Sequence, residues 1–190
     1  MNRRSFTSLL GVAALASVSA ACTTSSGSAT DAASKRKEID AGADGALNRL
    51  YASAGGSQGL AGKASGILVF PRILAAGFGV GGEYGEGVLR TGGAPAGYYR
   101  TTTASFGLQA GAQSKSLVLL FMTPDALRNF QQSKGWTAGV DGSVALATIG
   151  ANGQVDTNTA RAPIIGFVMT NAGLMANLSL EGTKISKLDI

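Results

Sequence analysis

The stretch that decides the fold runs from Gly66 to Leu89 and reads GILVFPRILAAGFGVGGEYGEGVL. It opens with the apolar run 67–70. Pro71 follows and has no N–H to donate to a strand ladder, so we expect it to end that strand. Six glycines then alternate with apolar and aromatic residues, at positions 77, 79, 81, 82, 85 and 87. Each glycine disfavours a helix by about 1 kcal/mol relative to alanine. The stretch is therefore predicted to be extended, and closely approached by a strand, a ring or a ligand.

Residues 77–82 also match G-x-G-x-x-G, the pattern of dinucleotide-binding sites. Such a site needs a helix to begin at the glycines, so that the helix N-terminus faces the pyrophosphate. Residues 83–87, EYGEG, do not favour a helix. We interpret the glycines as structural, and we expect no nucleotide, haem or flavin cofactor.

Residues 1–21 have the features of an export signal. Arg3 and Arg4 form a charged start, residues 9–18 are small and apolar, and Ser19-Ala20-Ala21 is a small-residue cleavage context. The apolar run is too short for a membrane span. Arg3-Arg4-Ser5-Phe6 resembles a twin-arginine signal. Export is predicted, and both the Sec and the twin-arginine routes remain open.

Cys22 is the only cysteine, so an intramolecular disulfide is excluded. Its place directly after residues 19–21 resembles a bacterial lipobox, in which the cysteine is acylated, for example with palmitate. Ser19 departs from that pattern, which usually has Leu or Val there. We predict a lipoprotein; the alternative is ordinary signal cleavage that leaves a free thiol. Thr23, a residue other than aspartate, resembles the signal for sorting to the outer membrane, which is the predicted location.

The remaining chain is predicted to hold a tether and one domain. Residues 22–33 comprise the anchor cysteine and a small, polar, flexible tether, and residues 34–190 are long enough for a single domain with a core. Residues 34–54 are predicted to form a helix capped by Ser34. Its apolar residues recur at three- and four-residue steps, at positions 39, 43, 46, 47, 50 and 51.

Lys35, Arg36 and Lys37 cluster at the start of this predicted helix. Close to a lipid anchor, such a patch would meet anionic headgroups, and each charge contributes about 1 kcal/mol near such a surface. Lys63 and Arg72 are further candidates for the same role. The alternative interpretation is an ordinary solvated helix start. Removal of Arg3 and Arg4 with the leader lowers the net charge from +5 to +3, which is too little for nucleic-acid binding.

Beyond Leu89 the pattern alternates between strands and turns, with one short helix. A turn is predicted at 91–95, a strand at 98–112, a second turn at 113–115 and a buried strand at 116–122. Thr123 is predicted to cap a helix over 124–133. Strands are then expected at 136–149, 164–169, 174–180 and 185–190, with turns at 152–153 and 171–173. The fold class is α+β: a single domain with a mostly antiparallel sheet or a barrel-like core, an N-terminal helix and a short internal helix.

An ordered series of motifs resembles the SYLF domain, also called the Ysc84 or DUF500 domain. The matching segments are 66–71, 76–82, 84–87, 106–113 and 178–182, and the resemblance covers residues 34–190. It implies a lipid-binding module that prefers phosphoinositides in eukaryotes, where some members bind actin. It also implies an exported lipoprotein in bacteria, and membrane binding by the N-terminal helix, which is 34–54 here.

The composition argues against an enzyme. The chain has no histidine and one cysteine, which excludes Ser-His-Asp and Cys-His catalysis and most zinc sites. No metal site is predicted. We therefore expect a membrane-anchored lipoprotein whose domain binds lipid, either an anionic phospholipid or a phosphoinositide-like one. The alternative is a structural or protein-interaction module of the cell envelope without specific lipid binding.

Overall fold

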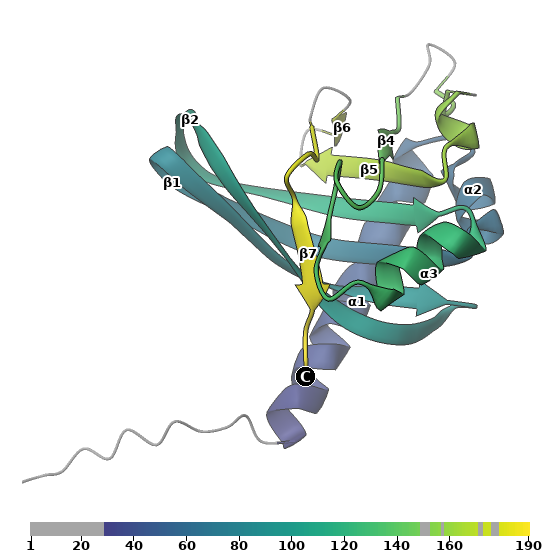
Figure 1. Ribbon diagram of the computed structural model, residues 1–190, viewed down its shortest axis with the longest axis horizontal. Helices are drawn as coiled ribbons and strands as arrows, with labels where there is room; N and C mark the ends of the chain where they lie inside the picture. The colour runs from purple at the N-terminus through teal and green to yellow at the C-terminus, as the bar shows by residue number, and fades with distance from the viewer. Residues whose placement is uncertain (1–28, 149–152, 157, 171–172, 176–178) are drawn as a thin grey trace, which may run out of the picture.

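The structure is a computed structural model that describes residues 29–148, 153–156, 158–170, 173–175 and 179–190, with the backbone alone for 76–80 and 105–112. Its strands form one strongly curled sheet that helices cover (Figure 1). All strand pairs are antiparallel except β4 with β5. The fold is a single α+β domain with a half-barrel sheet, which confirms the predicted fold class.

Two strands are much longer than the rest and organise the sheet. In chain order the elements are α1 (Ala29–Ser53), α2 (Ser57–Lys63), β1 (Gly66–Thr91), β2 (Ala94–Phe121), α3 (Pro124–Gln132), β3 (Trp136–Thr137), β4 (Ala145–Leu146), η1 (Thr159–Arg161), β5 (Ile164–Thr170), β6 (Gly173–Met175) and β7 (Lys184–Lys187). The strand order is β3-β7-β2-β5-β4, with β1 also on β2 and β6 on β5. Because the first part of β2 pairs with β7 and its last part with β5, one strand joins both halves of the curl.

β1 and β2 form one long hairpin that closes at Gly92 and Gly93. Both glycines have positive φ, 59° and 84°, as a tight hairpin turn with the correct twist requires. This confirms the turn predicted at 91–95. The ladder extends back from Thr91–Ala94 to the pair Gly66–Phe121.

Pro71 does not end the strand, contrary to the prediction. The register shifts between Phe70 and Ile73, so that Pro71 and Arg72 on β1 lie opposite Ser116 alone on β2. This is a β-bulge, which takes up a residue that cannot donate a ladder hydrogen bond and then lets pairing resume.

The turn predicted at 113–115 is also wrong, because β2 continues through these residues. Gln113, Ser114 and Lys115 pair with residues 75, 74 and 73 of β1. Polar side chains are compatible with a strand wherever the face they occupy is open to solvent. The structure places Gln113 and Ser114 among the exposed residues.

α1 begins earlier than predicted. It starts at Ala29, so Ser34 lies inside the helix rather than at its N-cap, and residues 29–33 of the expected tether are helical. The buried face of α1 is the predicted one, comprising Ile39, Ala43, Ala46, Leu47 and Leu50. Gly42 also has a role, because a Cβ added there would lie 3.0 Å from Pro71 Cβ. It lets the helix approach the bulge closely.

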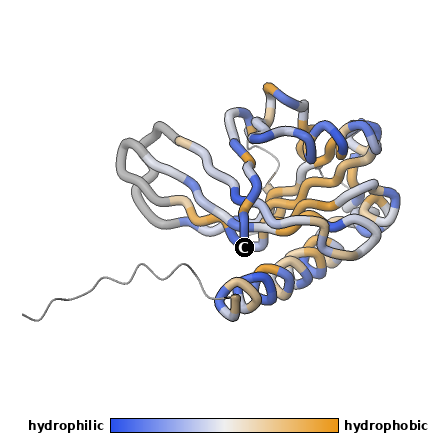
Figure 2. The backbone as a smooth tube through the Cα atoms, turned by 60° about the horizontal axis from the view of Figure 1, so that its bottom comes forward, coloured by the Kyte–Doolittle hydropathy of each residue, from blue (hydrophilic) through white to orange (hydrophobic). Residues whose placement is uncertain are grey.

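The core has two layers, one on each face of the sheet. One apolar cluster joins the buried face of α1 to Val69, Val88, Val118 and Phe167 of the strands. The other fills the inside of the curl with residues such as Phe70, Leu119, Phe121, Phe130 and Trp136. Figure 2 shows the hydrophobic stretches of the strands gathered over α1. The sheet thus positions α1 on one face and α3 on the other.

α3 matches the sequence prediction closely. Thr123 is its N-cap, and its side chain accepts a hydrogen bond from the Ala126 N–H at 3.2 Å. Leu127 and Phe130 face the core as predicted. The helix ends at Gln132, just before the predicted end.

The strands after α3 are shorter than predicted. The segment 136–149 holds only β3 and β4 in its described part, because a turn intervenes. There the Asp141 carboxylate accepts from the Thr137 N–H at 2.6 Å, and Gly139 has a φ of 86°. β5 is confirmed, β6 ends at Met175, and β7 comprises residues 184–187. The predicted turns at 152–153 and 171–173 and the strand part 176–178 fall wholly or partly outside the described residues.

Candidate functional site: a cationic groove between α1 and β1

A groove lies between α1 and the bulge of β1, and it is formed by two adjoining clefts. The larger has a volume of about 530 Å³ and the smaller about 380 Å³. Arg49, Pro71 and Arg72 line both clefts, so the two make one continuous surface. We call this surface the α1 groove.

The bulge at Pro71 is what puts Arg72 into the α1 groove. Side chains of a regular strand alternate between the two faces, so Arg72 would otherwise follow Phe70 into the interior. The extra residue shifts the alternation by one. Ile73 is then buried at 2 % exposure in the interior cluster, while Leu74 lines the groove and is 54 % exposed.

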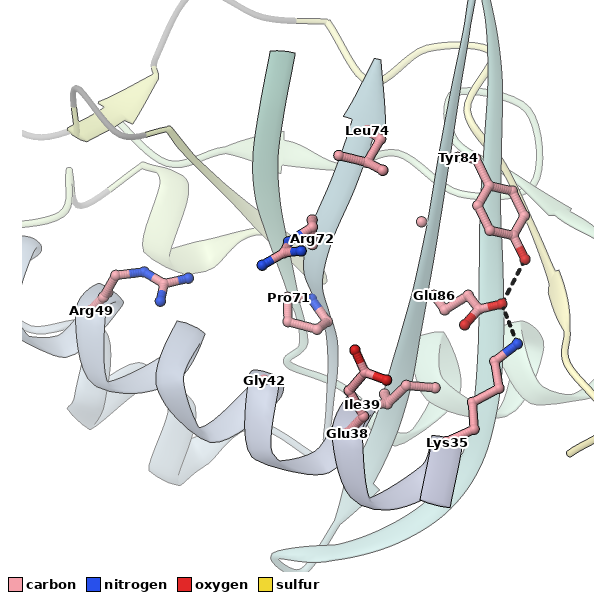
Figure 3. A pocket seen from close by; sticks show the side chains of 11 residues that line it. Lys35, Glu38, Ile39, Gly42, Arg49, Pro71, Arg72, Leu74, Tyr84 and Glu86 are labelled. Carbon is pink, nitrogen blue, oxygen red and sulfur yellow. Dashed lines mark hydrogen bonds and ion pairs between the residues drawn. The ribbon is translucent and has the colours of Figure 1, made fainter. Parts of the chain in front are cut away.

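Arg49 and Arg72 are the two cations of the α1 groove that have no acidic partner. Both are exposed. Within the described part of the chain, neither guanidinium group makes a hydrogen bond or an ion pair. Figure 3 shows the two side chains reaching toward each other, one from the helix and one from the strand. Each guanidinium group is planar and carries several N–H donors, so the two together suit phosphate or carboxylate oxygens.

Lys35 and Lys115, by contrast, are paired with glutamates of β1. Lys35 Nζ donates to Glu86 Oε1 at 2.7 Å, and Tyr84 Oη donates to the same oxygen at 2.7 Å. Lys115 Nζ lies 2.8 Å from each carboxylate oxygen of Glu83. Burial, followed by the hydrogen bond to Glu86 and the charge of Glu86, raises the pKa of Tyr84 above its usual value.

The α1 groove also exposes apolar surface. Leu74 and Tyr84 are among the large hydrophobic residues that remain exposed, at 54 % and 46 %, and both line the larger cleft together with Ile39 and Pro71. Ser114 and Ser116 line the smaller cleft beside Arg72. The groove therefore combines unpaired positive charge, the exposed carboxylate of Glu38, hydroxyl groups and exposed carbon within one surface.

The five predicted lipid-binding residues do not form a single cluster. Successive helical residues are about 100° apart, so Lys35, Arg36 and Lys37 point in different directions around α1. Arg36 donates to the backbone oxygen of Ile190 at 2.7 Å, whereas Lys37 is exposed. Lys63 is exposed at the end of α2 and lines neither cleft. Of the five, Lys35 and Arg72 both line the larger cleft of the α1 groove.

Arg49 is the residue of this site that the sequence analysis missed. It lies on α1 twelve positions beyond Lys37, with no other basic residue beside it. Helical periodicity could have placed it on the groove side, because it lies two full turns after Gly42. That Arg72 lies on the same surface as Arg49 follows only from the β-bulge at Pro71, which the sequence analysis did not predict.

The described residues give no sign of a metal centre or a membrane-spanning helix. No group of three His, Cys, Asp or Glu that could hold a metal ion is found among them. None of their helices has the length and apolar character needed to cross a membrane. Cys22 and the predicted leader lie outside the described residues.

Comparison with known families adds one match, over the C-terminal part of the chain. Residues 102–189 match the Ysc84 family, described as Las17-binding protein actin regulator. The match supports the SYLF (Ysc84) resemblance. The description of this family names protein binding and actin regulation rather than an enzymatic reaction. No curated protein matches the chain.

The matched range covers only part of the α1 groove. Ser114, Lys115 and Ser116 of β2 lie inside it, while Arg49 and Arg72 precede it. The family match therefore says nothing about Arg49 and Arg72.

Proposed function

We propose that this protein is an envelope lipoprotein whose domain binds the surface of anionic phospholipid membranes through the α1 groove. Arg49 and Arg72 carry the proposal, because within the described residues they present unpaired charge in the same cleft that exposed Leu74 and Tyr84 line. Unpaired arginines suit lipid phosphates, and neighbouring apolar side chains suit the region just below the headgroups.

Acylation at Cys22 and location at the outer membrane belong to the same proposal. A single acyl chain holds a protein only marginally on a membrane, and a cationic patch is a common second signal. The α1 groove, together with Lys37 on the same helix, would supply that second signal. The chain that joins Cys22 to α1 is short, since the described helix begins at Ala29, which keeps the domain near the bilayer.

Co-sedimentation with vesicles tests the lipid-binding proposal. Protein purified after export with Cys22→Ser, so that no acyl chain contributes, should bind phosphatidylcholine vesicles that contain phosphatidylglycerol and should not bind pure phosphatidylcholine. Arg49→Gln/Arg72→Gln should weaken this binding by at least tenfold, since each charge contributes about 1 kcal/mol near an anionic surface.

A matched double variant provides the control. Lys134 and Arg161 are also exposed and line neither cleft of the groove. Lys134→Gln/Arg161→Gln removes the same net charge and should leave binding within about twofold. Equal losses from the two double variants would contradict a role for the groove. Absence of binding by the parent protein would favour the alternative of a protein-interaction module.

A further inference from the structure

The α1 groove holds its cations in two different states. Among the residues that the structure describes, Arg49 and Arg72 have no acidic partner, while Lys35 and Lys115 are neutralised by Glu86 and Glu83. The two ion pairs also differ in exposure. The Lys115 and Glu83 side chains are only 14 % and 18 % exposed, whereas Lys35 and Glu86 are 40 % and 21 % exposed. Solvent and a membrane surface can therefore reach the Lys35 pair more readily.

Glu86 holds Lys35 with the help of a third residue. Its Oε1 accepts from both Lys35 and Tyr84, each at 2.7 Å, and all three residues line the larger cleft beside Arg72. In Figure 3, Tyr84 and Lys35 converge on this one oxygen at the edge of the groove. The tyrosine hydroxyl fixes the carboxylate in the place where it meets the lysine.

We propose that Glu86 is an internal competitor for lipid phosphate: it occupies Lys35 until an anionic surface displaces it. The inference rests on the proposed function of the groove and adds its regulation. A phosphate bound at Arg49 and Arg72 brings negative charge to the same cleft that Lys35 lines. Lys35 then exchanges the carboxylate for lipid phosphate, and Glu86 keeps its hydrogen bond from Tyr84.

This exchange makes binding depend steeply on the density of anionic lipid. Sparse charge leaves Lys35 with Glu86, and the groove acts with its two arginines alone. Dense charge recruits Lys35 as a third cation. The Lys115–Glu83 pair takes no part, because it is more buried and the lysine contacts both carboxylate oxygens.

The test measures vesicle binding against the mole fraction of phosphatidylglycerol, with exported protein carrying Cys22→Ser. Glu86→Gln should release Lys35 and lower the lipid concentration for half-binding by about two- to fivefold, the range expected for a partly exposed ion pair. Glu38→Gln is the matched control. Glu38 lines the same cleft and is exposed. Within the described residues its carboxylate has no ion pair or hydrogen bond, so its neutralisation removes the same charge without releasing a lysine.

Tyr84→Phe separates the competitor role from simple charge. It removes the hydroxyl that fixes Glu86 and leaves the net charge unchanged, so general electrostatics predicts no effect. The competitor role predicts stronger binding, in the direction of Glu86→Gln but smaller. In a protein that already carries Lys35→Gln, Glu86→Gln should have no more effect than Glu38→Gln.

The outcomes distinguish this inference from the function on which it rests. If the parent protein binds phosphatidylglycerol vesicles but Glu86→Gln and Glu38→Gln shift binding equally, and Tyr84→Phe does nothing, Glu86 is not a competitor and the lipid-binding proposal stands. If the parent protein and every variant fail to bind at low salt, both are overturned. The inference is supported if Glu86→Gln and Tyr84→Phe each strengthen binding and if this increase disappears in a protein that also carries Lys35→Gln.

Discussion

Gly87 lies directly against Val69 where the second half of β1 crosses the first. A Cβ atom added at Gly87 would overlap the carbonyl oxygen of Val69 and would lie 2.6 Å from Phe70 Cδ1. Gly85, two residues earlier on the same strand, is equally close to the first half of β1: a Cβ atom added there would lie 2.7 Å from Ile73 Cγ1. Glycine is therefore required here by close approach of two backbones, which is what folds the long hairpin over itself.

Gly87→Ala should accordingly destabilise the protein. The methyl group meets backbone rather than a flexible side chain, so the strands must separate, and overpacking of this kind costs about 1–3 kcal/mol. Urea unfolding followed by circular dichroism would show the loss as a lower midpoint. Gly62→Ala is the control, because no atom lies within 4 Å of its added Cβ and the helix α2 gains up to about 1 kcal/mol from alanine. An unchanged midpoint for Gly87→Ala would refute the crossing of the two halves.

Local signals in the sequence predicted one turn and one helix cap correctly, whereas the cap at Ser34 and the turn at 113–115 were wrong. The Gly92–Gly93 turn and the Thr123 cap depend on a few adjacent residues, and both are as predicted. The extent of β1 and β2 was not predictable in the same way. Considered alone, Pro71 and residues 113–115 each predict the end of a strand. In the fold, the bulge opposite Ser116 accommodates the proline and pairing continues through 113–115.

The candidate site was only half predictable for a similar reason. Lys35 and Arg72 were identified by their charge, but Arg49 was not, because its relation to Arg72 depends on a register shift between two strands. The ion pairs of Lys35 and Lys115 could not be predicted from local sequence patterns either. Glu86 is 51 positions from Lys35, and Glu83 is 32 positions from Lys115.

Stability should depend on pH mainly in the alkaline range in which the tyrosines titrate. Burial raises the pKa of Tyr51, Tyr84, Tyr98 and Tyr99 in the folded protein. The unfolded chain therefore loses these protons first, from about pH 10 upward. The stabilisation is complete below that pH and is lost as the pH rises through the folded-state pKa values. The chain has no histidine, so none titrates near neutral pH.

Melting temperatures between pH 7 and pH 11.5 would check this dependence. A nearly flat curve to about pH 9.5 followed by a decline is expected. Tyr99→Phe should reduce the decline, because Tyr99 is buried in the aromatic cluster with its ring 4.9 Å from Phe130 and phenylalanine preserves that packing. A decline that begins below pH 8 would show that groups other than the tyrosines dominate.

Cys22→Ser should release the protein from membranes. Acylation at this position would supply most of the anchoring energy, at about 0.8 kcal/mol per buried CH₂, whereas the groove contributes only the weaker second contact. Membrane and soluble fractions separated after an alkaline wash would show the change. The N-terminal mass of the parent protein provides an independent check. Ordinary cleavage without an added acyl mass would contradict lipidation, and so would equal fractionation of the two proteins.

The last prediction concerns the relative importance of Lys35, Arg36 and Lys37 in membrane binding. Because α1 begins at Ala29, these residues lie beyond its first turn, where the positive end of the helix dipole no longer opposes a cation. Lys35 and Arg36 are engaged by Glu86 and by the backbone of Ile190. The Lys37 ammonium group has no hydrogen bond or ion pair to the described residues, so its charge is available at once.

Single neutralisations should therefore rank in a definite order. Lys37→Gln should weaken binding to phosphatidylglycerol vesicles by about fivefold, the value of one full charge near an anionic surface. Lys35→Gln and Arg36→Gln should each weaken it less, since those cations must first leave their partners, and their urea midpoints should also fall slightly. The variant with all three substitutions should lose binding to these vesicles. Salt should weaken the binding of the parent protein, because the screening length shortens to ~3 Å at 1 M. Unchanged co-sedimentation of the triple variant would remove the start of α1 from the membrane contact and leave Arg49 and Arg72 as its cations.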